Sequence, residues 1–126
     1  MIVGTGIDLC EVDRIEKALA SAHGRRFRER VYTEREIAYA ERKARPGERY
    51  AARFAAKEAG MKALGTGWRG GLGWRDLEVA NLPSGRPTLR LYGKAKEIAD
   101  RLGVQNISLS LTHTAVQAMA LVILES

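Results

Sequence analysis

The chain has 126 residues, enough for one domain with a hydrophobic core and too few for two ordinary domains, so we expect residues 1–126 to form a single domain. Its formal net charge of +6 favours an anionic partner, such as nucleic acid, a phosphorylated substrate or an acidic protein. No apolar run approaches the roughly 18 residues of a membrane span. The first residues lack a signal-peptide pattern, and the single cysteine cannot form an internal disulfide. These features predict a cytoplasmic protein without a membrane segment.

Residues 1–7 are predicted to form a short strand, and residues 11–20 a helix with its apolar residues at helical spacing. Asp8 lies between these two elements, where it could be a metal ligand or a catalytic acid at the end of the strand. It could also cap the helix, because Asp8 and Glu11 match the D-x-x-E capping pattern. Spacing alone favours the capping role.

A dense basic segment, GRRFRER, covers residues 24–30 around Phe27. Its ordinary interpretation is a solvated charged face, and its functional interpretation is a surface that docks an anionic partner. Arg14, one turn into the preceding predicted helix, could belong to the same surface. RNA is less favoured as the partner, because one phenylalanine is a thin platform for base stacking.

A charged helix is predicted to begin at Thr33 and to reach about residue 43, because Thr33 and Glu36 form a T-x-x-E capping box. The segment Arg45-Pro46-Gly47 is expected to break this helix.

Residues 50–67 are predicted to form one helix closed by a glycine loop, because their alanines have high helix propensity and Gly65 can end the helix. Glu58 and Lys62 lie four residues apart, where the apolar side of the helix meets the exposed side. A carboxylate and an amine beside exposed backbone N–H groups would suit a metal–phosphate site, although such a pair more often only supports the helix. Nothing in the sequence assigns a role to Lys57.

The segment 65–70 matches G-x-G-x-x-G, but it follows a helix, so we expect a loop that can approach phosphates and not a dinucleotide site. The rest of the chain is predicted to hold strands at 76–82, 86–92, 107–111 and 116–124, and a helix at 94–102. The continuous apolar residues of 116–124 predict a strand buried on both faces. His113 lies at the last connection, between Thr112 and Thr114, where structural and functional roles are about equally favoured.

Three segments taken together resemble one family. GIDLCEVDRI (6–15), RFAAKEAGMKALGTG (53–67) and SLSLTHT (108–114) occur in the order and at the spacing of the holo-acyl-carrier-protein synthases, the small 4′-phosphopantetheinyl transferases. Each segment is weak alone, but the ordered set is specific and extends over nearly the whole chain. Gly60 departs from the family pattern, which often places a larger residue at this position.

The resemblance implies an α+β fold, a compact single domain in which a small, mainly antiparallel sheet packs with a long central helix and shorter helices. It implies an enzyme of fatty acid biosynthesis that transfers the 4′-phosphopantetheine group of coenzyme A to a serine of apo acyl carrier protein and releases adenosine 3′,5′-bisphosphate. The family requires Mg²⁺ and assembles as a homotrimer with active sites between neighbouring subunits.

The resemblance also implies roles for individual residues. Asp8 and Glu58 resemble the two protein ligands of Mg²⁺, a cation that prefers hard oxygen ligands. Lys62 resembles a phosphate-contacting lysine and completes the implied catalytic set. The implied coenzyme-binding residues are Arg53, Lys62, Arg86, Pro87, Thr112, His113 and Thr114. The implied docking face for the acidic acyl carrier protein consists of Arg14, Arg25, Arg26 and Arg28.

Two other functions stay open at this point. A basic nucleic-acid-binding module would fit the net charge, but it would leave Asp8 and Glu58 without a use and would call for more exposed aromatic side chains. A catalytically silent protein of the same family could bind the carrier protein only. The presence of Asp8, Glu58, Lys62 and His113 together argues against such loss of catalysis.

Overall fold

The structure, a computed structural model, describes residues 1–65 and 71–126. Within these residues the chain forms five α-helices and five strands, which confirms the predicted α+β class. In chain order the elements are β1 (Ile2–Glu11), α1 (Val12–Ala20), α2 (Gly24–Val31), α3 (Glu34–Glu41), α4 (Pro46–Leu64), the short 3-10 helix η2 (Trp74–Asp76), β2 (Leu77–Asn81), β3 (Pro87–Leu91), α5 (Gly93–Leu102), β4 (Asn106–His113) and β5 (Gln117–Glu125). No helix in the described part of the chain is long and apolar enough to cross a membrane.

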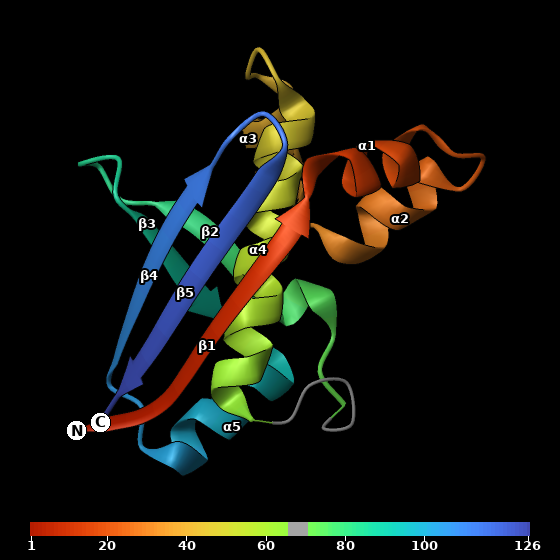
Figure 1. The fold of residues 1–126 in the computed structure, drawn as a ribbon. Helices are drawn as coiled ribbons and strands as arrows, with labels where there is room; N and C mark the ends of the chain where they lie inside the picture. The colour runs from red at the N-terminus through yellow and green to blue at the C-terminus, as the bar shows by residue number, and fades with distance from the viewer. Residues whose placement is uncertain (66–70) are drawn as a thin grey trace.

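The long helix α4 is the centre of the fold (Figure 1). Strands β1, β5 and β4 form an antiparallel sheet in that order, and α4 runs along one face of it. The hairpin of β2 and β3 is a separate two-stranded sheet, and α1 and α2 extend together to one side of the molecule. The two ends of the chain meet, because the backbone N–H of Ser126 donates to the carbonyl of Met1 at 2.9 Å.

Strand β1 lies directly on the backbone of α4. A side chain at Gly6 would collide with the carbonyl oxygen of Ala59, and one at Gly4 with the carbonyl oxygen of Ala63. Small residues on both elements therefore permit an approach that larger side chains would prevent. This close contact fixes the position of the residues that follow Gly6 on β1 relative to the second half of α4.

Some predicted boundaries were wrong in the first half of the chain. Strand β1 continues to Glu11, so Asp8 lies within a strand, and no side chain caps the start of α1. The capping role considered for Asp8 is thus excluded. The basic residues 24–30 belong to a helix, α2, that the sequence did not predict. Pro46 is the first residue of α4, where its missing N–H costs nothing, so the segment Arg45-Pro46-Gly47 leads into the central helix.

Several helix and turn signals are confirmed. The side chain of Thr33 accepts from the backbone N–H of Glu36, and Glu36 reciprocates, which completes the capping box of α3. Gly65 ends α4 in the left-handed conformation with φ of 80°, and Gly103 ends α5 in the same way. The predicted loop at residues 66–70 lies outside the described residues.

Strand β5 was predicted to be buried on both faces, and this is wrong for the single chain. Its burial alternates, with Ala118, Ala120, Val122 and Leu124 covered by the core. The opposite face carries Met119 and Leu121, which pair in register with Leu9 and Ile7 of β1. These four side chains are 40%, 38%, 50% and 56% exposed, respectively. The outer face of the sheet is therefore an uncovered apolar surface.

Candidate active site

The contact between β1 and α4 brings Asp8, Glu58 and Lys62 together. Lys62 Nζ lies 2.8 Å from Asp8 Oδ1, across 54 residues of sequence, and donates a second hydrogen bond to the carbonyl of Ile7 at 3.1 Å. Glu58 stands one turn before Lys62 on the same helix, and Asp8 contributes to raising the pKa of its carboxyl. Lys62 therefore pairs with a residue of a different element. A lysine that only supported the helix would pair with Glu58 on the same helix.

The ionisation of Glu58 is strongly affected by its surroundings. Burial raises the pKa of its carboxyl to about 7, and the hydrogen bond and negative charge of Asp8 act in the same direction. The positive charges of Arg14 and Lys62 oppose the increase. The bond to Asp8 in turn raises the pKa of Lys62, so its ammonium is retained. A cation bound by these two carboxyl groups would reduce the repulsion between their negative charges.

The donor set fits a hard divalent cation. Residues 1–65 and 71–126 hold no group of three or more histidine, cysteine, aspartate or glutamate side chains able to bind a metal. A cation at Asp8 and Glu58 would therefore have two protein ligands, and phosphate oxygens and water would complete its shell, an arrangement that Mg²⁺ favours. Cys10 is no competing ligand or nucleophile, because burial raises the pKa of its thiol to about 11.

Arg14 lies at the rim of this cluster. Its guanidinium carbon is 5.6 Å from the centre of the Phe54 ring, and its positive charge lowers the pKa of the Glu58 carboxyl, against the effect of burial. Phe54 stacks in turn on Trp74, with ring centres 4.8 Å apart. Aromatic packing therefore holds the positive charge of Arg14 beside the two carboxylates.

The four predicted docking arginines do not form one uniform face. Arg25 is paired with Glu29 at 3.0 Å along α2, and Arg28 lies 3.9 Å from Glu41 of α3. Arg26 lines an open groove of about 610 Å³. The other residues that line this groove are Ala22, His23, Arg25, Glu29, Arg30 and Arg75.

Sequence reasoning did not identify Arg75 as part of this surface, and it left Phe27 open as a platform for base stacking. Arg75 was not predicted, because it comes from η2, far along the chain from α2, and no spacing in the sequence links the two. Phe27, the single candidate for base stacking, is half-buried and packs edge-on against Tyr32, with ring centres 6.2 Å apart. The nucleic-acid alternative thereby loses its aromatic platform.

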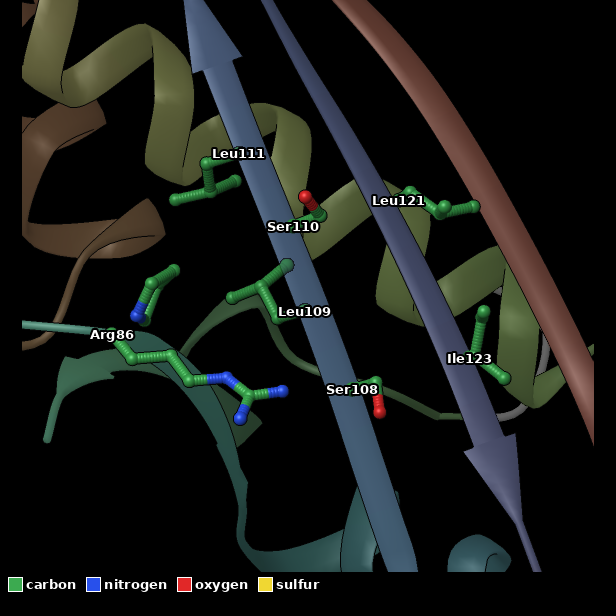
Figure 2. Close-up of a pocket in the computed structure, with 8 residues that line it drawn as sticks. Arg86, Ser108, Leu109, Ser110, Leu111, Leu121 and Ile123 are labelled. Carbon is green, nitrogen blue, oxygen red and sulfur yellow. The ribbon is translucent and has the colours of Figure 1, made fainter.

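The predicted coenzyme-binding residues are spread over several parts of the fold. Arg86 and Pro87 line a cavity of about 310 Å³ between the start of β3 and the sheet, and Figure 2 shows the Arg86 side chain extending toward Ser108 on β4. The remaining residues that line this cavity are Leu109, Ser110, Leu111, Leu121 and Ile123. Arg53 is only 4% exposed; its guanidinium stacks 3.9 Å from the centre of the Tyr39 ring and donates to Asn81 at 3.1 Å.

The turn Thr112-His113-Thr114 lies at the far end of β4, where Thr114 Oγ1 accepts from the backbone of Val116 and Gln117. His113 contacts Glu48, in the first turn of α4. Glu48 precedes Glu58 by ten residues on this helix, a separation of about 15 Å. Within one chain, then, the structure joins Asp8, Glu58 and Lys62 but does not bring His113 to them.

The chain is similar to known proteins over nearly its whole length. A model of the 4′-phosphopantetheinyl transferase superfamily, ACPS, matches residues 4–121. A holo-acyl-carrier-protein synthase of Solibacter usitatus is 64% identical over 126 residues, with all of both chains covered. The crystal structure of holo-acyl-carrier-protein synthase from Neisseria meningitidis superposes with a TM-score of 0.89 at 31% identity, covering 100% of each chain. That from Helicobacter pylori, in complex with coenzyme A, has a TM-score of 0.83 at 32% identity, covering 96% of this chain and 99% of that one.

The chain therefore belongs to the 4′-phosphopantetheinyl transferase superfamily, within the holo-acyl-carrier-protein synthase family. The predicted resemblance, the enzyme class and the transfer of phosphopantetheine to a carrier protein are confirmed at the level of the family. The structure also explains the departure at Gly60. A side chain there would meet the ends of Leu77 and Leu89, which fill the space themselves.

Proposed function

We propose that the cluster of Asp8, Glu58 and Lys62 is the centre at which this chain transfers the 4′-phosphopantetheine group of coenzyme A to a serine of apo acyl carrier protein. The observation that carries the proposal is the meeting of two carboxylates and a fixed ammonium at the β1–α4 contact. The Helicobacter pylori relative, whose structure contains coenzyme A, supports this substrate. Adenosine 3′,5′-bisphosphate is the leaving group.

Each side chain of the cluster has a distinct part in this reaction. Lys62 uses two of its three N–H donors on Asp8 and Ile7, so the third can donate to an oxygen of the coenzyme pyrophosphate. Asp8 and Glu58 would hold Mg²⁺, which neutralises charge on the pyrophosphate when bound. In the proposed reaction the Glu58 carboxylate also accepts the proton of the attacking serine hydroxyl.

The carrier protein docks beside this centre on arginine side chains. Arg14 is held against Phe54 and its charge acts on Glu58, and Arg26 contributes to the groove on α2. An acidic carrier surface would be attracted to both positions, and salt would weaken the attraction. Arg25 and Arg28 are already paired with Glu29 and Glu41, so their contribution to docking is smaller.

The active unit is a homotrimer with sites between subunits, located in the cytoplasm. Two observations support the assembly. The outer face of β1 and β5 exposes a row of paired apolar side chains that a second copy would cover. His113 and its two threonines lie too far from Glu58 within one chain to share a ligand's phosphate with it, so a neighbouring subunit would supply them.

The decisive experiment is intact-mass spectrometry of apo acyl carrier protein incubated with this protein, coenzyme A and Mg²⁺. We expect a gain of one phosphopantetheine arm that disappears when EDTA is added. Glu58→Gln should abolish the gain while circular dichroism stays unchanged, and Glu97→Gln, on the exposed side of α5, serves as the matched control. Absence of any mass gain with several apo carriers and folded wild-type protein would overturn the proposal.

A further inference from the structure

His113 is held between two side chains of α4. Its Nδ1 lies 3.2 Å from Oε1 of Glu48, and its Nε2 lies 3.4 Å from Nη1 of Arg49. The Glu48 side chain is 14% exposed and the His113 side chain 29%, so the carboxylate is the more deeply covered partner. The second oxygen of Glu48 is 3.4 Å from Nη1 of Arg45, on the solvent side. The end of the β4–β5 hairpin is thus tied to the first turn of the central helix.

The chemistry of these contacts determines which ring nitrogen carries hydrogen. A guanidinium can only donate, so Nε2 must act as the acceptor toward Arg49. Nδ1 then carries the hydrogen and donates it to Glu48. The two neighbours select the same tautomer, and together they restrict rotation of the ring.

We propose that Glu48 is a positioning residue, which fixes the orientation and the tautomer of His113 so that Nε2 accepts from Arg49 and holds its guanidinium in place to donate to a phosphate group. This inference rests on the proposed function, in which the turn that carries His113 meets the phosphates of coenzyme A. Glu48 acts through the opposite nitrogen of the ring and touches no substrate. The guanidinium that donates to the phosphate is therefore held by a ring whose orientation is fixed by a carboxylate on its far side.

The first test is spectroscopic and does not depend on activity. The chain has two histidines, so a ¹⁵N-edited spectrum of the imidazole nitrogens is simple, and the exposed His23 is an internal reference. At about pH 8, above the ordinary pKa of histidine, we expect His113 to show the tautomer protonated at Nδ1. Glu48→Ala should convert it to a mixture like that of His23, while Glu48→Gln should preserve it, because the amide oxygen still accepts. An unchanged His113 signal in Glu48→Ala would overturn the inference.

The second test separates positioning from a general structural role. Glu48→Ala should raise the KM for coenzyme A about tenfold, the size of one hydrogen bond to a charged group, while kcat and the KM for the carrier stay near wild type. In a double-mutant cycle, Glu48→Ala should have little further effect once His113 has been replaced by alanine. Additive effects in the cycle would overturn the inference. Glu97→Ala is the matched control.

The two failures can be told apart. If the wild-type protein does not transfer phosphopantetheine at all, the proposed function fails, and the spectrum still decides whether Glu48 fixes the ring. If transfer proceeds normally but KM for coenzyme A is insensitive to Glu48, the function stands and the positioning role is wrong.

Discussion

The ammonium of Lys57 lies 2.6 Å from the carboxylate of Glu36, and neither side chain is exposed to solvent. Lys57 Nζ also donates to the carbonyls of Trp74 and Leu77, at 3.1 and 2.6 Å, while Glu36 accepts from the backbone N–H of Val79 at 2.8 Å. One buried ion pair therefore joins α3, α4, η2 and the start of β2. Lys57, to which the sequence assigned no role, holds together the elements that surround the second half of α4.

Lys57→Met should destabilise the fold strongly, because it leaves the Glu36 carboxylate buried without its partner. Removing one member of a buried ion pair costs about 3–5 kcal/mol. The free energy of unfolding, measured with urea at one fixed protein concentration, is the test. Adding Glu36→Gln to this variant should recover part of the loss, since the buried charge is then gone.

The control for this prediction is Lys96→Met, which breaks the exposed pair with Asp100 on α5. Exposed pairs contribute about 0–1 kcal/mol, so this variant should unfold almost like the wild type. Equal losses for Lys57→Met and Lys96→Met would contradict a central role for the buried pair.

Gly6→Ala should abolish transfer, although the substitution adds a single methyl group. The new Cβ would collide with the backbone of Ala59, so β1 must move away from α4 and carry Asp8 away from Glu58 and Lys62. We expect loss of Mg²⁺-dependent activity together with a lower melting temperature. Gly73→Ala, the same substitution at a position where the new Cβ would make only ordinary contact, should change neither. Full activity of Gly6→Ala would mean that the spacing of these two elements is not critical.

In the metal-free protein, the contribution of Glu58 to the free energy of unfolding should fall as the pH rises. Its pKa is about 7 in the folded chain against an ordinary 4.5, so between these values the folded state holds a proton that the unfolded state has released. The free energy of unfolding therefore falls as the pH rises from 4.5 toward 7, and the stabilisation is fully present only below 4.5.

Glu58→Gln removes this effect. In EDTA the variant should melt at a higher temperature than the wild type at about pH 8, and the difference should disappear near the ordinary pKa of glutamate. Added Mg²⁺ should then raise the melting temperature of the wild type and leave Glu58→Gln unchanged. A constant difference across the whole pH range would rule out the raised pKa.

Local signals in the sequence predicted the parts of the fold that depend on neighbouring residues. The capping box at Thr33, the left-handed glycine after α4 and the hairpin between β2 and β3 each follow from residues within a few positions of one another. Helix α2 was missed, because its only large apolar residues are Phe27 and Val31, which give too little periodicity to separate a helix from a charged loop.

Long-range contacts could not be predicted in the same way. Glu36 looks like an ordinary capping residue, and only the fold brings Lys57 to it. The cluster of Asp8, Glu58 and Lys62 was named through resemblance to a family, whereas the bond between Asp8 and Lys62 depends on the approach of β1 to α4. The alternating burial of β5 was missed, because apolar residues on both of its faces leave no alternation for the sequence to show.

Arg26→Glu should weaken carrier docking more than Arg28→Glu does. Arg26 faces the groove with Arg30 and Arg75, while Arg28 lies beside Glu41. We expect the KM for acyl carrier protein to rise about tenfold in Arg26→Glu, with the KM for coenzyme A unchanged and a weaker dependence on salt. Arg101→Glu, on the exposed side of α5, controls for the change in net charge. Equal effects of the Arg26 and Arg101 variants would place the docking surface elsewhere.

Met119→Glu should convert the assembly to folded monomers and remove activity with it. Met119 pairs with Leu9 at the exposed apolar face of β5 and β1, so a charge there would be buried without a partner if three copies met at this face. Sedimentation velocity of the wild type should give a trimer and that of the variant a monomer, with the same helix content. Leu102→Glu, at a similarly exposed apolar residue at the end of α5, should stay trimeric and active. An active wild-type monomer would contradict the shared-site assembly.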